Sequence, residues 1–334
     1  MFMKKSIVRV ISVLSLMALL VTGCSSNSNK NDYGTNAPVN TEGQKTDGNT
    51  VNNSPATNAT TDNTTQTTKD AEEPVVTQEA VPVSTTPTVE EKVLYEDKGV
   101  KITLKGLEMD GMMGPELKFL VENDSDKSLM VQANDVSVNG YMVSTSMSVD
   151  VKQGKKANDK LRFLNSSLEM TGITTFADIE LRFHFINSED WTDYYDSDMI
   201  KIETSAAKDF DYTYDESGSS MYKSDDINVI FKGMSADASY VGPCMIVYIN
   251  NQSEQDIMVQ VRDASVNGFM VGTVFSCEVP KGKHAVDKIV FLDKDLEENG
   301  ITQFDNIELS LHISDKKTWK TIIDTEPIKA TFNR

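Results

Sequence analysis

Histidine side chains are the first residues of this sequence to test for metal chemistry. His184 and His312 occupy the same position in two copies of a repeated segment, and His284 stands where the first copy has Lys156. One histidine per site cannot assemble the usual zinc centre without cysteine ligands. We therefore interpret His184 and His312 as solvated residues on the polar face of a strand, and His284 as a loop residue.

Three acidic stretches offer the oxygen ligands that calcium prefers, namely residues 123–126 (NDSD), 188–198 and 208–216. None has the spacing of an EF-hand loop. The second copy does not keep the acidity of the first two stretches. We therefore interpret all three as solvent-exposed loops whose charge favours solubility. Calcium binding in the first domain or the linker remains the alternative.

Aromatic and sulfur side chains give two weaker signals. Trp191 and Trp319 are matched residues that would close the end of a sandwich by packing, with a sugar-stacking platform as the alternative. Met109, Met112 and Met113 are soft ligands of the kind copper accepts, but the second copy lacks them. Loop or core packing is the simpler interpretation of these methionines.

The N-terminus has the pattern of an export signal followed by a lipidation site. Residues 1–23 combine a basic start with an apolar run that is too short to span a bilayer. Val21-Thr22-Gly23-Cys24 resembles the bacterial lipobox, in which the cysteine becomes the lipidated N-terminus. We expect the mature chain to be held at the extracytoplasmic face of the cell membrane through Cys24.

Charge and cysteine content narrow the possible partners. Removal of residues 1–23 takes the net charge from −19 to about −22. So negative a chain is repelled by nucleic acid, and we expect no binding to it. The strand pattern predicts an outward side chain for Cys244 and an inward one for Cys277. Because these faces differ, we do not expect a disulfide between them, although an exported protein could form one. No nucleophile, phosphate-loop, dinucleotide or zinc-protease motif is present, and we expect neither catalytic residues nor a cofactor.

The elements that carry these residues form a tandem duplication. Residues 114–201 and 242–329 share 38 identities over 88 positions at a fixed offset of 128. The predicted organisation is a tether over 24–92 that is too polar to fold, a repeat over 93–204, an acidic linker over 205–216 and a second repeat over 217–334. We expect the two repeats to fold separately.

Local patterns within each repeat predict strands. In residues 177–185 (ADIELRFHF) apolar and polar residues alternate, which is typical of a half-buried strand. Asn139-Gly140 and Asn267-Gly268 predict type I′ hairpins, with Val138 opposite Tyr141 in the first copy. Residues 166–173 and 294–301 predict one helical turn each, closed by a glycine. The fold class is therefore all-β, with two tandem immunoglobulin-like β-sandwiches after a signal peptide and a disordered linker.

The segments VSVNGYMV, GKKANDKLRF, SLEMTGI and DIELRFHF, with the later tryptophan, resemble a domain repeated in surface lipoproteins of clostridia and related Gram-positive anaerobes. The resemblance covers both copies. It implies a Gram-positive surface location and a β-sandwich fold, and it brings no catalytic motif and no ligand.

Together these features predict a non-enzymatic, lipid-anchored surface protein whose repeats bind or display a protein or glycan partner. The alternative is an accessory subunit or sensor of a membrane-envelope complex, with calcium as a candidate ligand. An exposed apolar patch on a sandwich would favour the first of these.

Overall fold

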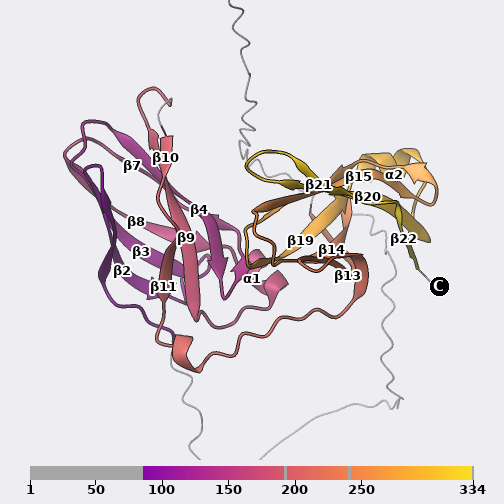
Figure 1. Ribbon diagram of the computed structural model, residues 1–334, viewed down its shortest axis with the longest axis horizontal. Helices are drawn as coiled ribbons and strands as arrows, with labels where there is room; N and C mark the ends of the chain where they lie inside the picture. The colour runs from indigo at the N-terminus through magenta and orange to yellow at the C-terminus, as the bar shows by residue number, and fades with distance from the viewer. Residues whose placement is uncertain (1–85, 192–193, 240–241, 333–334) are drawn as a thin grey trace, which may run out of the picture. The chain divides into compact units, whose positions relative to one another are not determined.

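The computed structural model describes residues 86–191, 194–239 and 242–332, which form two β-sandwich repeats (Figure 1). The signal peptide, Cys24 and nearly all of the tether lie outside the described residues. No helix among the described residues has the length and apolar character needed to span a membrane.

Repeat 1 consists of two antiparallel sheets and one short helix. The first sheet has the order β1-β2-β3-β8-β6; in the second, β9 pairs with β4, β10 and β11, while β4 also pairs with β5 and β7. The bounds are β1 (Lys92–Asp97), β2 (Val100–Glu108), β3 (Glu116–Asn123), β4 (Leu129–Val138), β5 (Tyr141–Met142), β6 (Thr145–Ser146), β7 (Ser148–Val151), β8 (Lys155–Phe163), α1 (Asn165–Thr171), β9 (Asp178–Asn187), β10 (Tyr194–Asp196) and β11 (Ile200–Glu203).

Repeat 2 follows a short 3-10 turn, η1 (Ala207–Asp209), and repeats the same arrangement. Its first sheet is β12-β13-β14-β19-β17; in its second, β20 pairs with β15, β21 and β22, while β15 also pairs with β16 and β18. The bounds are β12 (Ser219–Lys223), β13 (Ile227–Ser239), β14 (Gly242–Asn251), β15 (Ile257–Val266), β16 (Phe269–Met270), β17 (Thr273–Val274), β18 (Ser276–Val279), β19 (Lys283–Phe291), α2 (Asp293–Glu298), β20 (Asn306–Asp315), β21 (Thr321–Asp324) and β22 (Ile328–Thr331).

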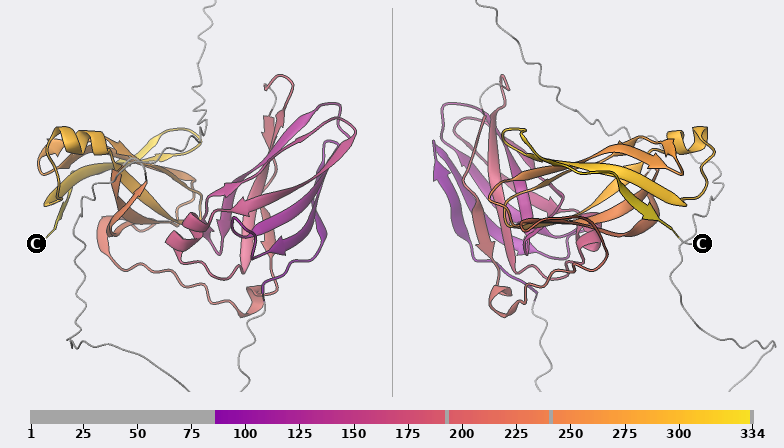
Figure 2. Two further views of the ribbon diagram at one scale, coloured as in Figure 1. Left: turned by 180° about the vertical axis from the view of Figure 1, so that it is seen from behind. Right: turned by 45° about the vertical axis from the view of Figure 1, so that its right-hand side comes forward.

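The strand correspondence between the repeats confirms the predicted all-β, tandem-sandwich fold. Each strand of repeat 1 has a counterpart of equal place in repeat 2, from β1 and β12 to β11 and β22, and α1 corresponds to α2. Figure 2 shows the two layers of each repeat in two further views. Each repeat also has its own apolar core between its sheets.

The alternating strand pattern fills these cores. Ile179, Leu181, Phe183 and Phe185 on β9 are fully buried, as the alternation predicts. Their side chains point to one face of the sheet because successive residues of a strand face opposite ways.

Both predicted hairpins are confirmed in register and in backbone conformation. Val138 pairs with Tyr141, and Val266 pairs with Phe269. Asn139 has φ 51° and Gly140 has φ 82°, the left-handed values that a type I′ turn requires. The repeated nonapeptide therefore sets the register between β4 and β5 and between β15 and β16.

The single predicted helical turn is also present in each repeat. After α1, Gly172 adopts φ 71° and its N–H donates to the carbonyl oxygen of Glu169 at 3.2 Å. This is the glycine-closed helix end that the sequence indicates. Gly300, at φ 63°, stands in the same place after α2.

Candidate docking hairpin

The hairpin of repeat 1 docks onto an edge of repeat 2. The backbone N–H of His284 on β19 donates to the carbonyl oxygen of Gly140 at 2.9 Å, and Tyr141 pairs with His284 in parallel register. Met142 packs against the apolar core of repeat 2. A two-residue hairpin tip thereby extends the sheet of the neighbouring repeat and contacts its core.

Aromatic rings surround this contact. The ring of Tyr141 lies 5.3 Å from that of Tyr214, 6.4 Å from that of Tyr248 and 5.7 Å from the imidazole of His284, all centroid to centroid. Tyr214 stacks on His284 at 3.7 Å. Ile230 and Tyr248 are almost completely buried beside Tyr141. The docked hairpin is thus held by a continuous apolar and aromatic contact.

His284 is a buried strand residue, and its prediction as a loop residue was wrong. Its side chain is 5% exposed, and Nδ1 lies 2.7 Å from the hydroxyl oxygen of Tyr248. Burial lowers the pKa of His284 to about 4, and the nearby carboxylate of Glu216 opposes this only in part. The imidazole is therefore neutral at pH 7.

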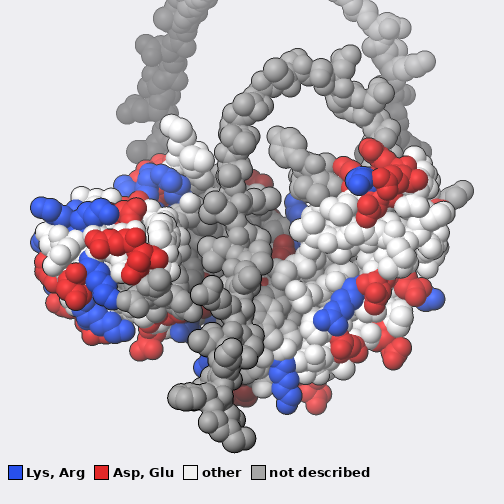
Figure 3. Space-filling model, turned by 90° about the horizontal axis from the view of Figure 1, so that it is seen from above, with Lys and Arg blue, Asp and Glu red and all other residues white. Residues whose placement is uncertain are grey.

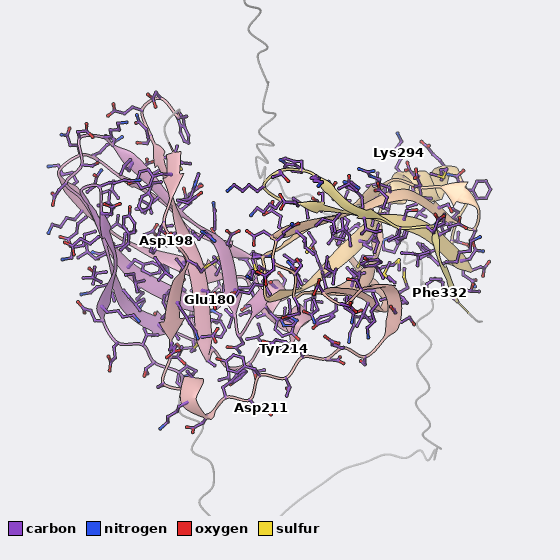
Figure 4. The ribbon with its side chains drawn as sticks, in the orientation of Figure 1. Glu180, Asp198, Asp211, Tyr214, Lys294 and Phe332 are labelled. Atoms are coloured by element: carbon purple, nitrogen blue, oxygen red, sulfur yellow. The ribbon has the colours of Figure 1, made fainter. Side chains whose placement is uncertain are left out.

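Ion pairs flank the aromatic contact. Lys283 Nζ lies 2.9 Å from Glu180 Oε2, and Lys316 Nζ lies 3.0 Å from Asp135 Oδ1 and 2.6 Å from Glu278 Oε2. Burial acts to lower the pKa of Lys316, but its two carboxylate partners outweigh that effect and raise it. Glu180, on β9, and Tyr214, between the repeats, are labelled in Figure 4.

The same hairpin of repeat 2 is exposed. Phe269 and Met270, at the positions of Tyr141 and Met142, are 49% and 65% exposed, and nearby Val274 is 56% exposed. By contrast, Tyr141 is only 9% exposed. Large apolar side chains exposed at a hairpin are typical of an interaction surface. We call Phe269 and Met270 the free hairpin.

Trp191 and Trp319 do not close the sandwiches, so the packing interpretation was wrong. Their side chains are 61% and 65% exposed. Each ends a tight turn with φ near 60°, and its N–H donates to a carbonyl oxygen four residues earlier, at 3.0 Å from Asn187 and 2.8 Å from Asp315. Both tryptophans therefore lie on the surface at the end of a turn rather than in a core.

His184 and His312 each contact an aspartate rather than being simply solvated. His184 Nδ1 lies 2.6 Å from Asp196 Oδ1, and His312 Nδ1 lies 2.5 Å from Asp324 Oδ1. His312 is only 7% exposed. Each pair links β9 or β20 to its neighbouring strand, a role common to both repeats.

The acidic stretches do not converge on a metal site within the described residues, where no group of three or more metal-ligating side chains occurs. Asn123, the first residue of the NDSD stretch, is fully buried, and its side-chain amide donates to the carbonyl oxygens of Lys127 and Val151. Asn251 makes the same contacts in repeat 2. This part of the stretch is therefore structural.

The sulfur residues differ in burial. Cys244 and Cys277 are both buried and form no disulfide, which corrects the outward position predicted for Cys244. Met109 packs against the core of repeat 1, whereas Met112 and Met113 are largely exposed.

Identity between the two copies does not reveal the acceptor surface for the hairpin, because its residues differ between the copies. Ile230, Tyr248, His284 and Val286 of repeat 2 replace Thr103, Leu120, Lys156 and Asn158 of repeat 1. Four substitutions toward apolar or aromatic character on one face are the signal that could have located it.

Figure 3 shows that acidic and basic side chains are interspersed on the visible face.

Comparisons with known proteins add little to this geometry. No protein-family model matches the chain, and no curated protein does. Among solved structures, the chain is similar to the YadV chaperone, at 9% identity over 65% of this chain and 92% of that chain, with a TM-score of 0.21. It is similar to a chain of the Salmonella enterica SafA pilin and SafB chaperone complex, at 10% identity over 71% and 98%, with a TM-score of 0.21. Scores this low carry no argument about function.

Proposed function

We propose that this chain is a non-enzymatic, lipid-anchored surface protein whose free hairpin docks onto a β-sandwich domain of a partner protein outside the membrane. The observation that carries the proposal is the contrast between Tyr141, 9% exposed in a docked hairpin, and Phe269, 49% exposed in the same hairpin of repeat 2. An exposed aromatic anchor beside apolar neighbours is typical of a protein interaction surface.

The docked copy indicates the chemistry of the partner. Its acceptor provides a strand edge with a backbone N–H for the turn carbonyl, together with aliphatic and aromatic side chains beneath the hairpin. Addition of a strand to an exposed sheet edge is a general mode of protein recognition. We infer that the partner presents an edge strand flanked by residues like Ile230, Tyr248 and Val286.

A second copy of the chain does not offer this surface. The acceptor of its repeat 2 already holds its own Tyr141 hairpin. The corresponding face of its repeat 1 carries Thr103, Lys156 and Asn158, which are polar and partly or fully exposed. The partner is therefore a different protein.

The place of docking follows from the predicted anchor. Lipidation of Cys24 would hold the repeats outside the cytoplasmic membrane, as in the clostridial lipoproteins that the repeats resemble. We expect Cys24→Ala to abolish fatty-acid labelling and to release the protein from the membrane fraction. Labelling that survives this substitution would contradict the anchor but leave the docking hairpin open.

The docking proposal is tested by photo-crosslinking on cells that express the anchored protein. A photoreactive residue at position 270 should link to one extracytoplasmic protein, with the linked site on an edge strand of a β-sandwich. Phe269→Asp in the same chain should abolish the product, because a buried carboxylate would be left without a partner. The matched control is the same group at Met112, which is fully exposed in repeat 1. Equal products from positions 270 and 112 would overturn the proposal.

A further inference from the structure

The side of repeat 1 between β1 and β11 is closed by the chain that enters it. Pro87 is buried, and Val89 packs against the core of repeat 1. Thr88 joins this segment to the end of β11, since its N–H donates to Ser205 Oγ at 3.0 Å and its carbonyl oxygen accepts from the Ser205 N–H at 2.9 Å. Residues 87–89, within the range assigned to the tether, therefore act as a plug between the two sheets.

The matching segment of repeat 2 is engaged elsewhere. Residues 214–216 occupy the positions of 87–89, but Tyr214 stacks on His284. Glu216 Oε1 accepts from the Tyr248 hydroxyl at 3.3 Å and from Asn250 Nδ2 at 2.9 Å. These contacts hold the segment against β14 and β19, so it does not plug the gap between β12 and β22.

A groove occupies that gap. Its cavity of about 260 Å³ lies between β12 and β22, and its floor consists of the core residues Met245, Ile307 and Leu309. Ala330 lines it where repeat 1 has the larger and fully buried Ile202. Phe332, labelled in Figure 4, lies at its wall against Phe231, with ring centroids 6.0 Å apart. The groove thus lies over the core of repeat 2 at the place where Ile202 and the plug cover the core of repeat 1.

The strands that border the groove are available for hydrogen bonding. Within the described residues, β12 pairs only with β13 and β22 pairs only with β20. Each strand therefore keeps one edge without a partner strand, and an extended chain can bond to such an edge while alternate side chains enter the groove.

We propose that the groove between β12 and β22 binds an extended segment of a partner protein that carries small apolar residues at alternate positions, as Pro87 and Val89 do in repeat 1. The segment replaces the plug that repeat 2 lacks. This surface is distinct from the free hairpin, so the inference goes beyond the proposed function and stands or falls separately.

The experiment uses the mature chain, residues 24–334, with Cys24→Ser for solubility, and a synthetic peptide of the plug sequence STTPTVEE, residues 84–91. We expect saturable binding, with amide NMR shifts concentrated in β12 and β22. The peptide with aspartate in place of Val89 should bind at least tenfold more weakly, because the groove floor is apolar.

The groove is tested in the protein by Ala330→Phe, which fills the cavity and should weaken peptide binding at least tenfold. Ile322→Phe is the matched control, since it enlarges an exposed apolar residue of β21 outside the groove. Phe269→Asp should leave peptide binding unchanged, which separates this inference from the docking hairpin. Absence of saturable binding, or shifts centred on β1 and β11, would overturn the proposal.

Discussion

Repeats 1 and 2 have the same strands in the same order, yet matched surfaces are covered in repeat 1 and exposed in repeat 2. In repeat 1 the hairpin is docked and the side between β1 and β11 is plugged. In repeat 2 the hairpin is free and the corresponding side is open. The difference teaches that one sandwich can serve as an internal support while its copy keeps the same features available for binding. The predictions below set matched residues of the two repeats against each other.

The largest expected effect concerns the aromatic anchor of the hairpin. Tyr141→Ala removes a buried ring and should lower the free energy of unfolding by about 3 kcal/mol. Phe269→Ala, at the same position of the free hairpin, should cost no more than about 0.5 kcal/mol. Differential scanning calorimetry measures both. Equal losses would mean that the hairpin of repeat 1 is not docked in solution.

The second effect is a pH dependence that arises from His284, which has no histidine counterpart in repeat 1. The pKa of His284 in the folded chain, about 4, lies below the value near 6.5 of an unfolded histidine. The unfolded state therefore binds more protons, so the stability that the neutral imidazole contributes at pH 7 is lost as the pH falls from 6.5 toward 4. At pH 5 the loss should be about 2 kcal/mol.

Urea unfolding at pH 7 and pH 5 measures this loss. His284→Gln should reduce the difference in unfolding free energy between the two pH values by about 2 kcal/mol. A pH difference that persists in the His284 variant would show that another group is responsible.

The third effect concerns two lysines at matched positions. Lys283 is 9% exposed and pairs with Glu180, whereas Lys155 in repeat 1 is exposed. Lys283→Ala should destabilise the chain by about 1 kcal/mol, because it leaves a partly buried carboxylate without its partner. Lys155→Ala should change stability by less than about 0.5 kcal/mol. A double-mutant cycle with Glu180→Gln separates the pair from other losses.

The fold could be predicted largely from the sequence because its signals are local. The Asn-Gly turns, the glycine after each helix and the alternation of residues 177–185 each fix a conformation through a few neighbouring residues. The duplication then predicted two sandwiches instead of one. Each of these features depends on backbone preferences that act within a turn or a strand.

The candidate site could not be predicted in the same way, because it depends on contacts between residues far apart in the sequence. His284 looks like a substituted loop lysine until β19 is placed beside Gly140. Trp191 and Trp319 looked like core residues because tryptophan is usually well buried, whereas their turns place them outside. Residues at matched positions of the two repeats have different roles, and the positions at which the repeats differ form the acceptor surface.

The smallest expected effect tests those turns. Trp319 adopts φ 59°, which a bulky aromatic residue tolerates poorly and asparagine tolerates well. Trp319→Asn should therefore leave stability unchanged or raise it by up to about 0.5 kcal/mol, and Trp191→Asn should do the same. Thermal unfolding measures both variants. A loss above about 1 kcal/mol would show that the ring packs in solution.

The polar face of repeat 1, with Thr103, Lys156 and Asn158, gives the tandem a direction of growth. A further copy of this domain could be added after the free hairpin, provided that it carried an apolar acceptor like that of repeat 2. The hairpin of a further copy could not dock onto repeat 1 in the same way, because the polar face of repeat 1 offers no apolar acceptor. Repeat 1 thus corresponds to the terminal cap of a repeat array, and the free hairpin of repeat 2 corresponds to its open end.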